Sequence, residues 1–115
     1  MRNGWLAKLE VALADTADVH VDAGVDAGTY FRQLADDIRA HVCEPFEVTA
    51  SVEPPGFPDA AVGATISGWC VAHNRSGVWL VYQPAQDRFY GFWGASAAHL
   101  GARGVYGSPL YCWSA

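Results

Sequence analysis

Charged residues are scarce in this chain of 115 residues, where they make up 17%, against roughly 25% in an average soluble domain. Hydrophobic residues make up 51%, and this balance excludes intrinsic disorder, which needs low hydrophobicity and high charge. Basic residues are fewer than acidic ones, seven against twelve, so the chain has a net charge of -5. Because nucleic-acid binding rests on neutralising phosphates with Lys and Arg, we expect no nucleic-acid partner.

Long apolar runs are also missing. The longest uncharged stretches contain Gly, Ser, His and Asn, so we expect no membrane span and no membrane partner. Lys8 and Glu10 interrupt the apolar run that an N-terminal secretion signal would require, which predicts a cytoplasmic protein. The length is that of one domain, and we predict a single domain over residues 1–115.

Cysteines number only three: Cys43, Cys70 and Cys112. An odd number at wide spacing is not a disulfide framework, so we interpret them as buried free thiols. Cys70 and His73 have the spacing of one pair of zinc ligands, but a zinc site needs about four ligands. In an extended strand these two side chains would also point to opposite faces. We therefore predict no metal and no cofactor.

Motifs that carry chemistry are few. The aspartates of residues 15–26 do not have the spacing of a calcium-binding EF-hand loop, and we interpret them as a solvated acidic loop. Gly101, Gly104 and Gly107 recur every third residue without the strand and helix of a dinucleotide site. We interpret that stretch as an irregular loop. No residue is assigned a catalytic role.

The clearest helix is predicted over residues 29–43, where apolar residues recur at helical spacing: Phe31, Leu34, Ala35, Ile38 and Val42. Asp26 or Thr29 can cap its start, and Pro45 is expected to stop it. Residues 4–15 fit a helix face but also alternate in part as a strand would. Their alanines favour a helix.

Strands are predicted over residues 46–52, 64–73, 77–83 and 88–93, where apolar and polar residues alternate or apolar runs are short. Residues 53–60 contain three prolines and are expected to be a loop. Residues 96–101 are predicted to form one helical turn, and residues 110–113 a short final strand. Helices followed by hairpins indicate an α+β two-layer domain, with the N-terminal helices on one face of an antiparallel meander sheet of about four to five strands.

The two halves of the chain differ sharply in character. Residues 1–65 hold eleven acidic and four basic residues, whereas residues 66–115 hold four charges and ten of the fifteen aromatic residues. Both faces of the predicted strands at 78–82 and 89–93 are apolar, and aromatic residues are enriched at interfaces. The candidate interface or pocket residues are therefore Trp69, Trp79, Tyr82, Phe89, Trp93 and His73. The alternative is that residues 94–115 cover the second face.

Three functions are compatible with these features. The first is a small acidic cytosolic interaction domain of bacterial type, which forms a homodimer through its aromatic sheet. Such a domain can also bind a basic partner protein, as a toxin-neutralising immunity protein would. The second is a binding domain for a small apolar or aromatic ligand, held in a cavity between sheet and helices. The third, which we favour least, is a small enzyme that uses His73, His99, Cys112 or Asp87.

Overall fold

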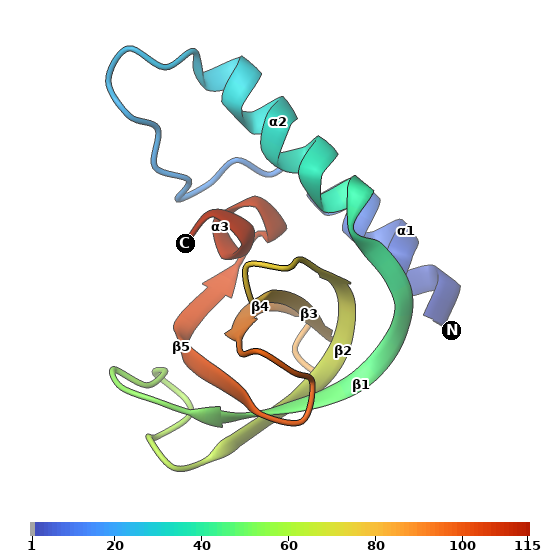
Figure 1. Cartoon of the computed structure of the whole chain (residues 1–115), viewed down its shortest axis with the longest axis vertical. Helices are drawn as coiled ribbons and strands as arrows, with labels where there is room; N and C mark the ends of the chain where they lie inside the picture. The colour runs from blue at the N-terminus through green and yellow to red at the C-terminus, as the bar shows by residue number, and fades with distance from the viewer. Residues whose placement is uncertain (1) are drawn as a thin grey trace.

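The structure is a computed structural model that describes residues 2–115, and Figure 1 shows its arrangement. Two helices come first, then five strands, then a short third helix. The elements are α1 (Arg2–Ala12), α2 (Ala27–Ala40), β1 (Val42–Val52), β2 (Thr65–His73), β3 (Val78–Gln83), β4 (Arg88–Trp93), β5 (Leu100–Gly107) and α3 (Pro109–Ser114). The α+β class, with helices before an antiparallel meander, is confirmed.

The predicted helical segments both form, with different ends. The Asp26 side chain caps α2 by accepting a hydrogen bond from the Thr29 backbone N–H at 2.9 Å. The helix ends at Ala40, not at Cys43, because the chain leaves helical geometry at His41 and enters β1 at Val42. Pro45 therefore does not end the helix; it lies within β1.

The sheet closes on itself, which the sequence patterns did not predict. Strands β1 to β5 follow one another as antiparallel neighbours. In addition, β1 pairs with β5 in parallel, with Ala50 opposite Leu100 and Val52 opposite Ala102, so that the five strands form a closed barrel. Figure 1 shows α1 and α2 beside this barrel and α3 between α2 and the barrel.

Two predictions near the C-terminus are wrong. Residues 100–107 form β5, not an irregular loop. Of the predicted turn at 96–101, one backbone hydrogen bond remains, from the His99 N–H to the Ser96 carbonyl. Residues 109–114 form a helix, not a strand, because the Ser108 hydroxyl accepts from the Tyr111 backbone N–H at 3.2 Å and Pro109 supplies a first residue suited to a helix.

The closed sheet creates two apolar cores, one on each side of the strands. One fills the barrel and includes Cys70, Trp79, Val81, Tyr90 and Phe92. The other lies between the barrel and the helices; its members are Leu9, Leu13, Ala35, Ile38, Val71, Ala72, Leu80, Tyr82, Phe89, Leu110, Cys112 and Trp113. This second core explains why both faces of β3 and β4 are apolar.

Within residues 2–115, no helix has the length and apolar character needed to cross a membrane.

Candidate functional site

Three of the six candidate aromatic-face residues are buried inside the chain. Trp79 is 8% exposed and lies in the barrel core, where its indole N–H donates to the Gly94 carbonyl at 2.9 Å. Tyr82 and Phe89 lie in the helix-side core with their ring centres 5.0 Å apart. These three residues therefore have almost no surface to offer a partner in this conformation.

The other three candidates are half-buried and lie in different surroundings. The Trp69 ring packs on Trp5 of α1 with centres 4.7 Å apart, and the guanidinium of Arg103 lies 5.9 Å from the Trp93 ring. His73 stacks on Trp79 at 4.5 Å. A register shift in β2 between Cys70 and Ala72 places Cys70 and His73 on the same side of the sheet. Our expectation of opposite faces, which assumed a regular strand, is therefore wrong.

The residues considered for catalysis have separate partners. Cys112 is fully buried in the helix-side core, and burial raises the pKa of its thiol. Asp87 accepts a hydrogen bond from the Tyr82 hydroxyl at 2.6 Å and forms an ion pair with Lys8 at 3.1 Å. These two contacts lower the pKa of Asp87. Burial, followed by that hydrogen bond, raises the pKa of Tyr82 to about 12. A nucleophile with a neighbouring base is not formed by these side chains.

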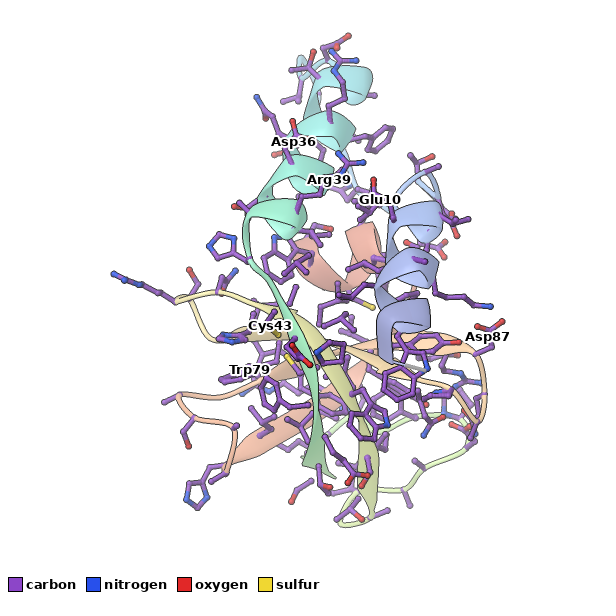
Figure 2. All side chains as sticks on the ribbon, turned by 90° about the vertical axis from the view of Figure 1, so that its right-hand side faces the viewer. Glu10, Asp36, Arg39, Cys43, Trp79 and Asp87 are labelled. Carbon is purple, nitrogen blue, oxygen red and sulfur yellow. The ribbon has the colours of Figure 1, made fainter. Side chains whose placement is uncertain are left out.

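Most basic side chains of the described residues are held in intramolecular ion pairs. Figure 2 shows Arg39 between Glu10 of α1 and Asp36 of α2, at 2.7 and 2.9 Å. The other pairs are Lys8 with Asp87, Arg88 with Asp59 and Arg103 with Glu53. These pairs connect the helices, the strands and the loops, and they use acidic groups of the helices and of the connections between strands.

The connection between α1 and α2 keeps its negative charge. No Lys or Arg occurs between Lys8 and Arg32 in the sequence. In the described part of the chain, Asp18 has no ion-pair partner, and the ion pair of the Asp22 carboxylate is with the His20 imidazole, at 2.9 Å. Val19, between these aspartates, packs against the helix-side core and anchors the connection. The acidic side chains consequently stay at the surface.

This acidic connection forms one wall of a surface hollow of about 330 Å³. Asp18, His20 and Asp22 line it together with Tyr30 of α2 and Tyr111 of α3. Figure 1 shows the connection as a long blue loop that bows out beside α3. Carboxylates and aromatic rings that face one hollow are the groups that attract a guanidinium or an ammonium ion.

The charge pattern of the sequence indicates the acidic loop but not the hollow. The pattern at residues 110–113 predicts a strand that includes Tyr111, and no motif includes Tyr30. A signal was present in the pair Ser108-Pro109, which predicts the start of a helix and would have placed Tyr111 on it.

Comparison with protein-family models, curated proteins and solved structures found no match to this chain.

Proposed function

We propose that this protein is a cytoplasmic interaction domain that binds a basic partner protein through the acidic hollow. One observation carries the proposal: Asp18 and Asp22, which have no Lys or Arg partner in the described chain, face the same hollow as Tyr30 and Tyr111. The occupant we propose is an arginine or lysine side chain of the partner. A role in neutralising a basic toxin fits this chemistry.

The physical chemistry of the hollow favours a cation in two ways. An exposed ion pair contributes about 0.2–1 kcal/mol, and a cation over an aromatic ring about 0.5–1 kcal/mol. Several such contacts at one place give measurable binding, and opposite charge over the wider surface raises the association rate. Val25, which is 48% exposed and also lines the hollow, offers an apolar contact for the aliphatic part of the incoming side chain.

Self-association through the aromatic sheet stays a prediction, and of its six candidate residues Trp69, His73 and Trp93 keep part of their surface exposed. Trp79 cannot lie at the centre of a dimer unless the barrel opens, because it is 8% exposed. Light scattering after size exclusion tests the prediction: a particle of 12.4 kDa would contradict the homodimer. The alternative of an apolar ligand between sheet and helices has less support, since the helix-side core occupies that space.

The experiment uses a short fluorescent peptide of alternating arginine and glycine as the probe, with fluorescence anisotropy as the readout. The variant D18N/D22N removes both carboxylates of the hollow. The control E44Q/E47Q removes the same charge from the exposed residues Glu44 and Glu47 of β1. We expect the first variant to weaken binding roughly 2- to 30-fold and the control to bind within about twofold of the wild type.

Two results would contradict the proposal. Equal weakening in both variants would show that only net charge attracts the peptide. Unchanged affinity in D18N/D22N would show that the peptide binds elsewhere. A lysine–glycine peptide, measured in parallel, compares the two cationic side chains in the same hollow. A glutamine–glycine peptide checks that the positive charge is required.

A further inference from the structure

Two of the three cysteine residues are in contact. Cys43 lies near the start of β1 and Cys70 lies in the neighbouring strand β2. The Cys43 Sγ is 3.7 Å from the Cys70 carbonyl oxygen, and the Cys70 Sγ is 3.4 Å from the Ala72 carbonyl oxygen. Cys43 packs against the barrel core that contains Cys70. Figure 2 labels Cys43 at the point where β1 crosses in front of β2. Cys112 belongs to the other core, on the helix side of the sheet.

The environments of the two sulfur atoms differ in the way that sequential thiol oxidation requires. Cys43 is half-buried, whereas Cys70 is fully buried. The neighbouring Cys70 thiol lowers the pKa of Cys43, against the opposing effect of burial. The neighbouring Cys43 thiol, followed by burial, raises the pKa of Cys70. The thiolate is the reactive form, so Cys43 is the better nucleophile of the pair.

Cys43 lies where the hydrogen-bonded pairing of β1 with β2 is irregular. The pairing of β1 with β2 shifts register between Val42 and Phe46. A disulfide needs a sulfur–sulfur distance of about 2.05 Å, so oxidation requires the two sulfur atoms to move closer together. The irregular segment that carries Cys43 can make this adjustment without breaking the regular ladder from Phe46 to Ser51.

We propose that Cys43 and Cys70 form a two-thiol oxidation site that takes a hydroperoxide, with Cys43 as the attacking thiol and Cys70 as the resolving thiol. The site is separate from the acidic hollow, and it does not depend on the proposed binding function.

The reaction balances in two steps. The Cys43 thiol first loses its proton to water, and the thiolate then attacks the terminal OH oxygen of the hydroperoxide. The O–O bond breaks, and the other oxygen takes up a proton from water, which replaces the one lost by Cys43, and leaves as an alcohol or water. The product is a sulfenic acid at Cys43. Cys70 then attacks that sulfur, the S–S bond forms, and the sulfenic oxygen leaves as water with the Cys70 proton. Two thiols are oxidised by two electrons, and one hydroperoxide is reduced.

The test uses the reduced full-length protein and hydrogen peroxide, with N-acetylcysteine as the reference thiol. We expect the wild type and C112S to lose two thiols and the mass of two hydrogen atoms. Peptide mapping should link Cys43 to Cys70, and dithiothreitol should reverse the change. The reaction should be faster than that of N-acetylcysteine. In C70S, dimedone should label Cys43. In C43A, Cys70 should stay reduced over the same time.

Three results would overturn the inference. One is a reaction slower than that of N-acetylcysteine, another is a disulfide that includes Cys112, and the third is oxidation of Cys70 in C43A. Circular dichroism of each variant establishes that it is folded. Should C43A fail to fold, C43S provides the same comparison with a smaller change of shape, and C112S tests the pair with both of its thiols intact.

Discussion

Ile38 of α2 is the residue whose truncation tests the packing of the helices on the barrel most sharply. Its side chain is 0% exposed and lies in the helix-side core. The change Ile38→Ala removes about three carbon groups, each worth about 0.8 kcal/mol on burial, and it leaves a cavity. We expect the free energy of unfolding to fall by about 2–5 kcal/mol.

Urea denaturation followed by circular dichroism measures this loss. With a slope of about 1–3 kcal/mol per molar, the midpoint should fall by roughly 0.7–5 M. The control is Gln33→Ala on the exposed face of the same helix, which should stay within about 0.5 kcal/mol of the wild type. Ile38→Val, at about 0.5–1.5 kcal/mol, keeps the test measurable if the alanine variant is unfolded. Equal midpoints for Ile38→Ala and Gln33→Ala would refute the assignment of the buried face.

Three further predictions concern other contacts. Asp37→Ala removes the carboxylate that accepts a hydrogen bond from the buried Trp113 indole N–H at 2.8 Å, and it should lower the free energy of unfolding by about 1–3 kcal/mol. Asp37→Asn should recover part of this loss. Equal urea midpoints for Asp37→Ala and the wild type would contradict the prediction. Gly104→Ala places a Cβ 2.7 Å from a carbonyl oxygen at a φ of +89° and should cost about 1–3 kcal/mol in the same assay. Side-chain hydrogen bonds lower the pKa of Asp26 and Glu10 in the folded state from 3.8 and 4.5. Their stabilisation is therefore complete above these ordinary values and is lost as the pH falls from them through the lower folded-state values. The temperature of the unfolding midpoint should accordingly decrease as the pH is lowered below about 4.5.

The fold class follows from local patterns in the sequence, and the errors have identifiable causes. The stripe of α2 and the alternation of β1 overlap at Val42, which is four residues from Ile38 and is also a good strand former. Only the tertiary structure assigns it to β1. Three glycines made residues 100–107 resemble a loop and not a strand. Gly104 is needed there because its missing side chain lets β5 pass close to the backbone of the β1–β2 connection.

Barrel closure was beyond local patterns. The parallel pairing joins residues 50–52 to residues 100–102. The periodicity within either segment carries no information about which distant strand it pairs with. Barrel closure also explains why three of the aromatic candidates are buried. A sheet with two apolar faces suggested an interface, but Trp79 lies inside the barrel and the helices cover Tyr82 and Phe89. The acidic loop, in contrast, is recognisable from its charges alone. That Tyr30 and Tyr111 lie beside it is known only from the folded structure.

The most direct test of the proposed function is to locate the arginine–glycine peptide on the protein by NMR. Backbone amide shifts are followed during a titration, at low salt and again at physiological salt. The account predicts that the largest changes fall on residues 18–22, Tyr30 and Tyr111, around the hollow, and that they are lost in D18N/D22N. Changes centred on Glu44 and Glu47, or spread evenly over all acidic residues, would contradict it.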